Sequence, residues 1–124
     1  MTPEQRVVLA AIDAVNAGHP DSLDDLVSVD LVDHGALRGE NACTAGVRYE
    51  VHDVFGSGDR VAVRATVRGL HTSGRLGFAA TGRPFAVATM HICRVTGGLL
   101  TEHWCVRDDM TLLRQVGVLT NPGG

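Results

Sequence analysis

Apolar residues near the N-terminus recur at the spacing of a helix. Val8, Ile12 and Val15 stand three or four residues apart, so they would lie on one side of an α-helix. Thr2 is a good N-cap, because its side-chain oxygen can accept a backbone hydrogen bond, and Gly18 is a good stop. The pattern therefore predicts an amphipathic helix between Thr2 and Gly18.

The segment after this helix has a shorter and less regular pattern. LDDLV follows Asp21 and Ser22, and it predicts a second short helix that is capped by one of those two residues. The next segment, DLVDHGALRG, contains two glycines, which are common in loops. We expect it to run into a loop.

From Tyr49 onward, apolar and polar positions alternate as they do along half-buried β-strands. The clearest case begins at Arg60, where one face of the strand would carry Val61, Val63, Ala65 and Val67. YEVHDVF comes before this strand, whereas FAVATMHICRV and LLTEHWCVRD follow it and are joined by the turn TGG. MTLLRQVG predicts a closing helix. Helices followed by long antiparallel strands indicate the α+β class.

Composition and charge narrow the possible partners. The chain has 124 residues, which suits a single domain over residues 1–124 with a core of its own. Its net charge is -3 and it has no basic run, which argues against nucleic acid as the main partner. No segment is typical of a signal peptide or of a membrane span. Cys43, Cys93 and Cys105 lack C-x-x-C spacing, which favours a reduced cytoplasmic setting.

Histidines are the first candidates for chemistry. Four of them follow apolar segments, where a side chain can point inward: His34, His71, His91 and His103. His19 and His52 are expected at the surface. In a hairpin that turns at TGG, His91 falls opposite His103 or Trp104, and the sequence leaves both registers open. A single histidine is usually a core or rim residue, but four together indicate a cavity lining. No metal-ligand spacing is present, so we expect no metal.

Two carboxylates, Asp108 and Asp109, stand where the last strand meets the closing helix. The simplest interpretation is that both cap the helix. The alternative is that Asp109 caps the helix while Asp108 faces a cavity beside Trp104. Apolar walls would then raise the pKa of Asp108 above its usual ~3.9 and make it a usable general base.

Three segments resemble the SnoaL-like polyketide cyclases of the nuclear-transport-factor-2-like superfamily. EHWCVRDDMTLLRQVGVL is similar to their closing motif, VRGLHTSGRLGFAATGRPFAV to their glycine-rich stretch, and DLVDHG to their early D-x-V-D-H. The resemblance covers nearly the whole chain in the same order. It implies a cone-shaped α+β fold, in which a curved antiparallel sheet wraps around the N-terminal helix and leaves a cavity between them.

The resemblance also implies an activity and a site. The family's acid/base aspartate falls on Asp108, and its pocket residues fall on His34, His71, His91, His103 and Trp104. That aspartate removes a proton from a carbon beside a carbonyl, and an aldol closure follows without metal or organic cofactor. We therefore expect a cyclase or isomerase that acts on a small apolar carbonyl compound, often as a homodimer. His91 or His103 would polarise the carbonyl or orient Asp108, and Trp104 would pack on the ligand.

The chain departs from the family pattern between Gly39 and Tyr49, where a helix and its loop are missing. A pocket without that wall would be open on one side, and we expect Phe78 or a partner subunit to cover the opening. Two other interpretations stay open. One is a non-catalytic ligand-binding or accessory protein on the same fold, and the other is an interaction module that pairs through its exposed sheet face.

Overall fold

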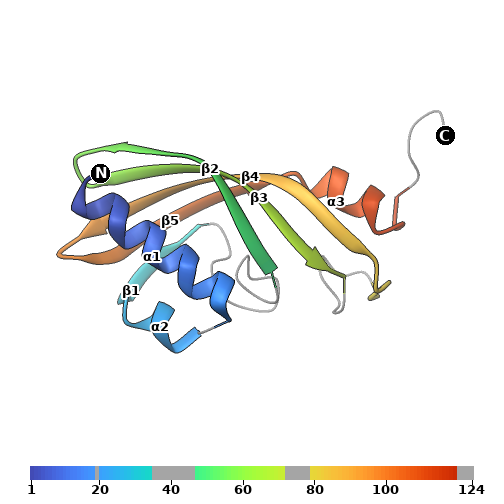
Figure 1. Ribbon diagram of the computed structural model, residues 1–124, viewed down its shortest axis with the longest axis horizontal. Helices are drawn as coiled ribbons and strands as arrows, with labels where there is room; N and C mark the ends of the chain where they lie inside the picture. Colours follow the sequence, from blue (N-terminus) through green and yellow to red (C-terminus); the bar gives the residue numbers. More distant parts are fainter. Residues whose placement is uncertain (19, 35–46, 72–78, 120–124) are drawn as a thin grey trace.

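One helix lies along a strongly curved sheet, and a second helix lies at the far end of that sheet (Figure 1). The computed structural model describes residues 1–18, 20–34, 47–71 and 79–119. The elements in chain order are α1 (Pro3–Ala17), α2 (Pro20–Asp24), β1 (Val27–Asp33), β2 (Val47–Ser57), β3 (Arg60–Leu70), β4 (Pro84–Thr96), β5 (Leu99–Arg107) and α3 (Asp109–Gln115). No helix in this part of the chain is long and apolar enough to cross a membrane.

The boundaries of α1 are those predicted from its caps. The side-chain oxygen of Thr2 accepts a hydrogen bond from the backbone N–H of Gln5 at 3.1 Å. At the other end Gly18 adopts a left-handed conformation with φ of 71°, which ends the helix. The buried side of α1 includes Val8 and Ala11, and it packs against the sheet.

The alternating pattern of β3 is confirmed. Its four predicted inward residues are each at most 2 % exposed: Val61, Val63, Ala65 and Val67. β4 alternates in the same way, with Phe85, Val87 and Thr89 buried on the same side. We call this side, which carries α1 and α3, the inner face of the sheet. The opposite side is the outer face.

The strand β1 is the main departure from the predicted architecture. The segment expected to run into a loop forms an edge strand that pairs in parallel with β5, in the sheet order β1-β5-β4-β3-β2. The sheet is therefore mixed rather than antiparallel. Two backbone hydrogen bonds, both 2.8 Å long, join the ends of this parallel pair: Leu100 N to Leu26 O and His34 N to His103 O. Val29 is fully exposed, so β1 lacks the buried alternation by which strands are recognised in a sequence.

The helix α2 also begins earlier than predicted. It starts at Pro20, a residue favoured in the first turn because its missing N–H needs no partner there. Asp21 and Ser22 therefore lie inside the helix, and the prediction that one of them caps it is wrong.

A side-chain amide fastens the end of α1 to the edge strand β2. Asn16 Nδ2 donates to the backbone oxygen of Tyr49 at 2.9 Å, and Asn16 Oδ1 accepts from the backbone N–H of Tyr49 at 2.7 Å. Gln115 of α3 makes the same pair of bonds to Ala86 of β4. Each amide bonds both the backbone N–H and the backbone C=O of one strand residue. These paired bonds hold the two helices at fixed positions over the inner face.

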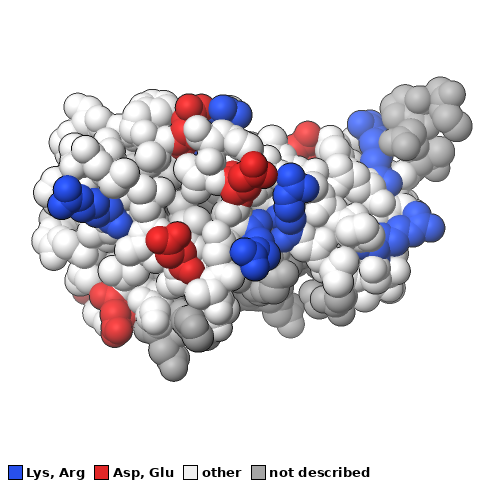
Figure 2. All heavy atoms as spheres, viewed as in Figure 1, with Lys and Arg blue, Asp and Glu red and all other residues white. Residues whose placement is uncertain are grey.

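Charged side chains are mixed on the surface. Figure 2 shows acidic and basic residues interspersed on one face, and neither sign forms a continuous patch among the described residues there. Several acidic and basic side chains pair across neighbouring strands, such as Asp53 with Arg64 at 2.6 Å and Glu50 with Arg68 at 3.3 Å.

Candidate functional site

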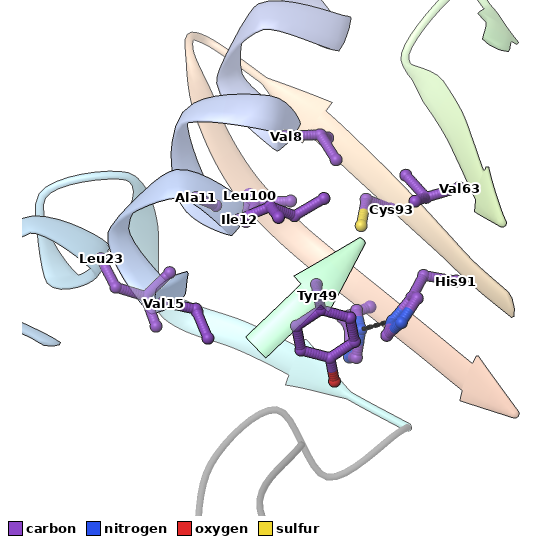
Figure 3. Close-up of a pocket in the computed structure, with 11 residues that line it drawn as sticks. Val8, Ala11, Ile12, Val15, Leu23, Tyr49, Val63, His91, Cys93 and Leu100 are labelled. Atoms are coloured by element: carbon purple, nitrogen blue, oxygen red, sulfur yellow. Dashed lines mark hydrogen bonds between the residues drawn. The ribbon is translucent and has the colours of Figure 1, made fainter. Parts of the chain in front are cut away.

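A small pocket lies between α1 and the inner face of the sheet (Figure 3). Its volume is about 50 Å³. Aliphatic side chains of α1, α2 and the sheet form most of its wall, and Tyr49, His91, Cys93 and His103 complete it. The pocket is thus apolar except at the end where the two histidines meet.

The two histidines belong to a continuous hydrogen-bonded chain. His91 Nδ1 lies 3.1 Å from His103 Nε2, the contact marked in Figure 3, and His103 Nδ1 lies 3.2 Å from Asp33 Oδ1. At the other end, His91 Nε2 lies 3.1 Å from the hydroxyl oxygen of Thr89. His103 is 2 % exposed, whereas the side chain of Asp33 is 22 % exposed. The chain therefore connects the buried pocket to a carboxylate that water can reach.

The chemistry of the chain fixes the order of its protons. A carboxylate only accepts hydrogen bonds, so Asp33 accepts from His103 Nδ1–H. His103 Nε2 then accepts from His91 Nδ1–H, which leaves His91 Nε2 without a proton. The Thr89 hydroxyl can donate to this nitrogen or to the backbone oxygen of Ala65 at 3.5 Å. His91 Nε2 is consequently a basic nitrogen on a residue that lines the pocket.

Burial keeps both histidines neutral. Loss of water around His91, together with the repulsion of His103, lowers the pKa of His91 from 6.5 to about 4. Burial also lowers the pKa of His103, although the hydrogen bond and charge of Asp33 act in the opposite direction. At pH 7 His91 is therefore neutral, and one of its ring nitrogens carries no proton.

The lowered pKa of His91 predicts a pH-dependent stability. In the unfolded chain His91 takes up a proton near pH 6.5, whereas in the folded chain it does so near pH 4. Between these values the unfolded state binds more protons, so the free energy of unfolding falls as the pH is lowered from 6.5 to 4, by about 3 kcal/mol for this group. We expect the urea midpoint to follow this fall, and we expect a clearly flatter profile for His91→Asn. Identical profiles for the two proteins would contradict the buried, neutral state of His91.

The structure settles which residues of β5 face the pocket. Cys93 pairs with His103 and Ile92 with Trp104, so His103 points to the inner face and Trp104 to the outer face. Neighbouring residues on a strand point to opposite sides. The expectation that both enter one pocket is therefore wrong. His91 pairs with Cys105 and shares the inner face with His103.

On the outer face Trp104 is covered by two other side chains. The His34 ring stacks on it with centroids 5.1 Å apart and planes 14° apart, and the Arg60 guanidinium lies 5.8 Å from the ring centroid. His34 is exposed and forms a hydrogen bond with Glu102, with Nε2 and Oε2 2.8 Å apart. The prediction that His34 points inward is wrong, because β1 ends at the residue before it and His34 follows on the outer side.

His71 is buried as predicted, but it does not line the pocket. It is 1 % exposed at the end of β3, and its Nδ1 accepts a bond from the backbone N–H of Thr81 at 3.2 Å. Its Nε2 is buried with no hydrogen-bond partner in the described part of the chain. Phe78, the predicted cover of the pocket, lies outside the described residues, as does most of the segment between Gly39 and Tyr49.

The structure reverses the predicted roles of the two carboxylates beside α3. Asp108 is the N-cap: its carboxylate accepts bonds from the backbone N–H of Thr111 at 3.1 Å and from the Thr111 hydroxyl at 2.7 Å. These bonds lower the pKa of Asp108 rather than raise it, and the side chain is exposed. Asp109 lies inside the helix and accepts from Arg107 Nε. The cause is that β5 ends at Arg107, one residue earlier than predicted.

Asp33 is the site residue that the sequence did not reveal. It stands directly before His34 in the segment DLVDHG, and its partner His103 lies 70 residues later in the chain. Among the described residues, no three His, Cys, Asp or Glu side chains converge as metal ligands. Cys93 is buried and Cys105 half-buried, in the places expected for small core residues.

A curved α+β sheet that packs against an N-terminal helix and leaves a pocket between them defines the nuclear-transport-factor-2-like fold. A solved protein of that fold from Burkholderia pseudomallei superposes on this chain with a TM-score of 0.73 at 16 % identity. The match covers 94 % of this chain and 99 % of the Burkholderia chain. The family model described as SnoaL-like polyketide cyclase matches residues 5–116, and the chain belongs to this family.

The chain is also similar to a curated relative and to a solved structure, each about a quarter identical over most of the chain. Aklanonic acid methyl ester cyclase DauD from Streptomyces sp. (strain C5) is 27 % identical, and the alignment covers 94 % of this chain and 83 % of DauD. The structure of TsrD from Streptomyces laurentii is 26 % identical, with a TM-score of 0.79 and coverage of 94 % and 96 %.

Proposed function

We propose that this chain is a cofactor-independent enzyme of the cyclase or isomerase type, which removes a proton from a carbon beside a carbonyl group. The observation that carries the proposal is the chain from His91 through His103 to Asp33 at the polar end of an apolar pocket. Membership of the cyclase family supports this chemistry. Its relative DauD is named as a cyclase of aklanonic acid methyl ester, and we propose a polyketide-like carbonyl compound as the substrate class.

The proton would move along the chain in two linked steps. His91 Nε2 takes the proton from the substrate carbon, while the proton on His91 Nδ1 passes to His103 Nε2 over the 3.1 Å contact. A base whose conjugate acid has a pKa of about 4 is weak on its own. Moving the positive charge to His103 offsets this weakness, because Asp33 stabilises a cation there.

The enolate then has two outcomes. In a cyclase it attacks a second carbonyl of the same molecule, and in an isomerase it takes the proton back at another carbon. Asp108, the base implied by the family resemblance, is an exposed helix cap, and its catalytic role stays a prediction. Assigning the base to His91 agrees better with the position of the pocket.

Exchange of a carbon-bound proton tests this proposal directly. We expect the protein in D₂O with a chelator to accelerate the exchange of the α-protons of diethyl ketone, followed by NMR. The chelator should have no effect, since no step uses a metal. Exchange no faster than in buffer would favour the non-catalytic ligand-binding interpretation.

We also infer that the outer face pairs with a second copy of the chain. Four apolar side chains on this face are 45–74 % exposed: Phe55, Met90, Ile92 and Val106. Met90 and Val106 are cross-strand partners, so their side chains form one continuous apolar surface. We expect a dimer in sedimentation velocity and a monomer for Val106→Lys. A wild-type protein that is monomeric at tens of micromolar would contradict this inference.

A further inference from the structure

The apolar part of the pocket is too small for most of a polyketide. Its volume is about 50 Å³. A cavity of roughly 150 Å³ binds benzene, which has six carbon atoms, and drug-sized ligands occupy roughly 300–1,000 Å³. By this comparison the pocket accommodates about two or three non-hydrogen atoms, so a larger substrate must leave most of its structure outside.

The walls of this pocket are well supported. Val63 of β3 and Leu100 of β5 are each 2 % exposed, and Val8 of α1 is 3 % exposed. Side chains packed this tightly do not move apart without loss of contacts. Ile12 is only partly buried, and it lines the pocket from the middle of α1 (Figure 3). Val15 is also partly buried, but Ile12 is the larger of the two, so its truncation would enlarge the space more with little disturbance of the core.

The chemistry of the walls restricts what can enter. Aliphatic side chains offer no hydrogen-bond partner, so a hydroxyl or a charged group would be buried there at a cost of several kcal/mol. The polar groups are at one end, where His91 and His103 meet. A group that fills the pocket is therefore a short alkyl chain, and its carbonyl lies at or beyond the histidine end.

We propose that the pocket selects a short, unbranched alkyl ketone end, of methyl or ethyl size, and that Ile12 sets this limit. The proposal rests on the proposed function, since the α-carbon of such an end is the one placed beside His91. His91 Nε2 accepts the α-proton, the C–H electron pair forms the enolate double bond, and the carbonyl oxygen takes the negative charge. Return of a solvent-derived proton to the same carbon completes an exchange without any co-reactant.

Three symmetrical ketones test the size limit: acetone, diethyl ketone and diisopropyl ketone. All three carry α-protons, so the enzyme-catalysed exchange rate of each is divided by its own rate in buffer. We expect this ratio to be about 10–200-fold smaller for diisopropyl ketone than for diethyl ketone, the discrimination typical of one extra methyl group in a filled pocket. Ile12→Ala should raise the ratio for diisopropyl ketone at least about tenfold, and the milder Ile12→Val should raise it less. Leu70→Ala, a truncation at a residue that is 54 % exposed and outside the pocket lining, should restore none.

A binding measurement tests the size limit independently of the catalytic proposal. Tyr49, the single tyrosine of the chain, lines the pocket, so its ring signals report occupancy without any chemistry. If diethyl ketone shifts these signals, diisopropyl ketone does not, and neither ketone exchanges, the size limit stands and the catalytic proposal fails. If both ketones bind and exchange equally well in the wild-type protein, the size limit is overturned and the catalytic proposal stands.

Discussion

His91→Asn is expected to lower the rate of α-proton exchange by about 10²–10⁴-fold, the usual contribution of a positioned general base. Asparagine carries no basic nitrogen, so nothing in its place can take the proton from the substrate. Its amide can still donate toward His103 Nε2, as His91 Nδ1 does over 3.1 Å in the wild-type protein. The change therefore removes the base and keeps the rest of the chain of hydrogen bonds.

His52→Asn is the matched control for this variant. His52 is exposed on β2, where its Nε2 lies 2.7 Å from the Thr66 hydroxyl, remote from the pocket lining. We expect its exchange rate to equal that of the wild-type protein, as measured by NMR under the same conditions. A His91→Asn protein that is folded and exchanges at the wild-type rate would remove His91 from the mechanism.

Local signals explain which parts of the fold could be predicted. The caps of α1 and the alternation of β3 depend on residues that are neighbours in the chain, and both predictions are confirmed. The strand β1 depends on β5, about 70 residues later, and its own side chains are largely exposed. An edge strand of this kind has no periodic signature, so its parallel pairing and the mixed sheet could not be read from the sequence.

The candidate site could be predicted only in part, for the same physical reason. His91 and His103 were recognised as candidates, but their shared face follows from the register of the β4–β5 hairpin, which shifts between Arg94 and Val95. The bond from His103 to Asp33 spans 70 residues and leaves no local trace. The opposite faces of His103 and Trp104, in contrast, follow from the period of two along a strand and were within reach of the sequence.

Asp33→Asn is expected to slow α-proton exchange by up to about 10⁴-fold, although Asp33 does not line the pocket. An amide in place of the carboxylate can donate to His103 Nδ1, which then carries no proton. His103 Nε2–H would donate to His91 Nδ1, and the remaining proton of His91 would move to Nε2, the nitrogen that must act as the base. The same change of tautomer follows when the aspartate of a Ser-His-Asp triad is replaced by asparagine, with a loss of that size.

Asp108→Asn is the variant that separates the two candidate carboxylates. Asparagine caps a helix nearly as well as aspartate, so both the fold and the exchange rate should change little if His91 is the base. Nitrogen NMR of the histidine rings gives a second measurement: we expect His91 Nε2 to be unprotonated in the wild-type and Asp108→Asn proteins and protonated in Asp33→Asn. If Asp108→Asn instead loses exchange while Asp33→Asn keeps both its rate and its tautomers, the base is Asp108, as the family resemblance implies, and the histidine chain is structural.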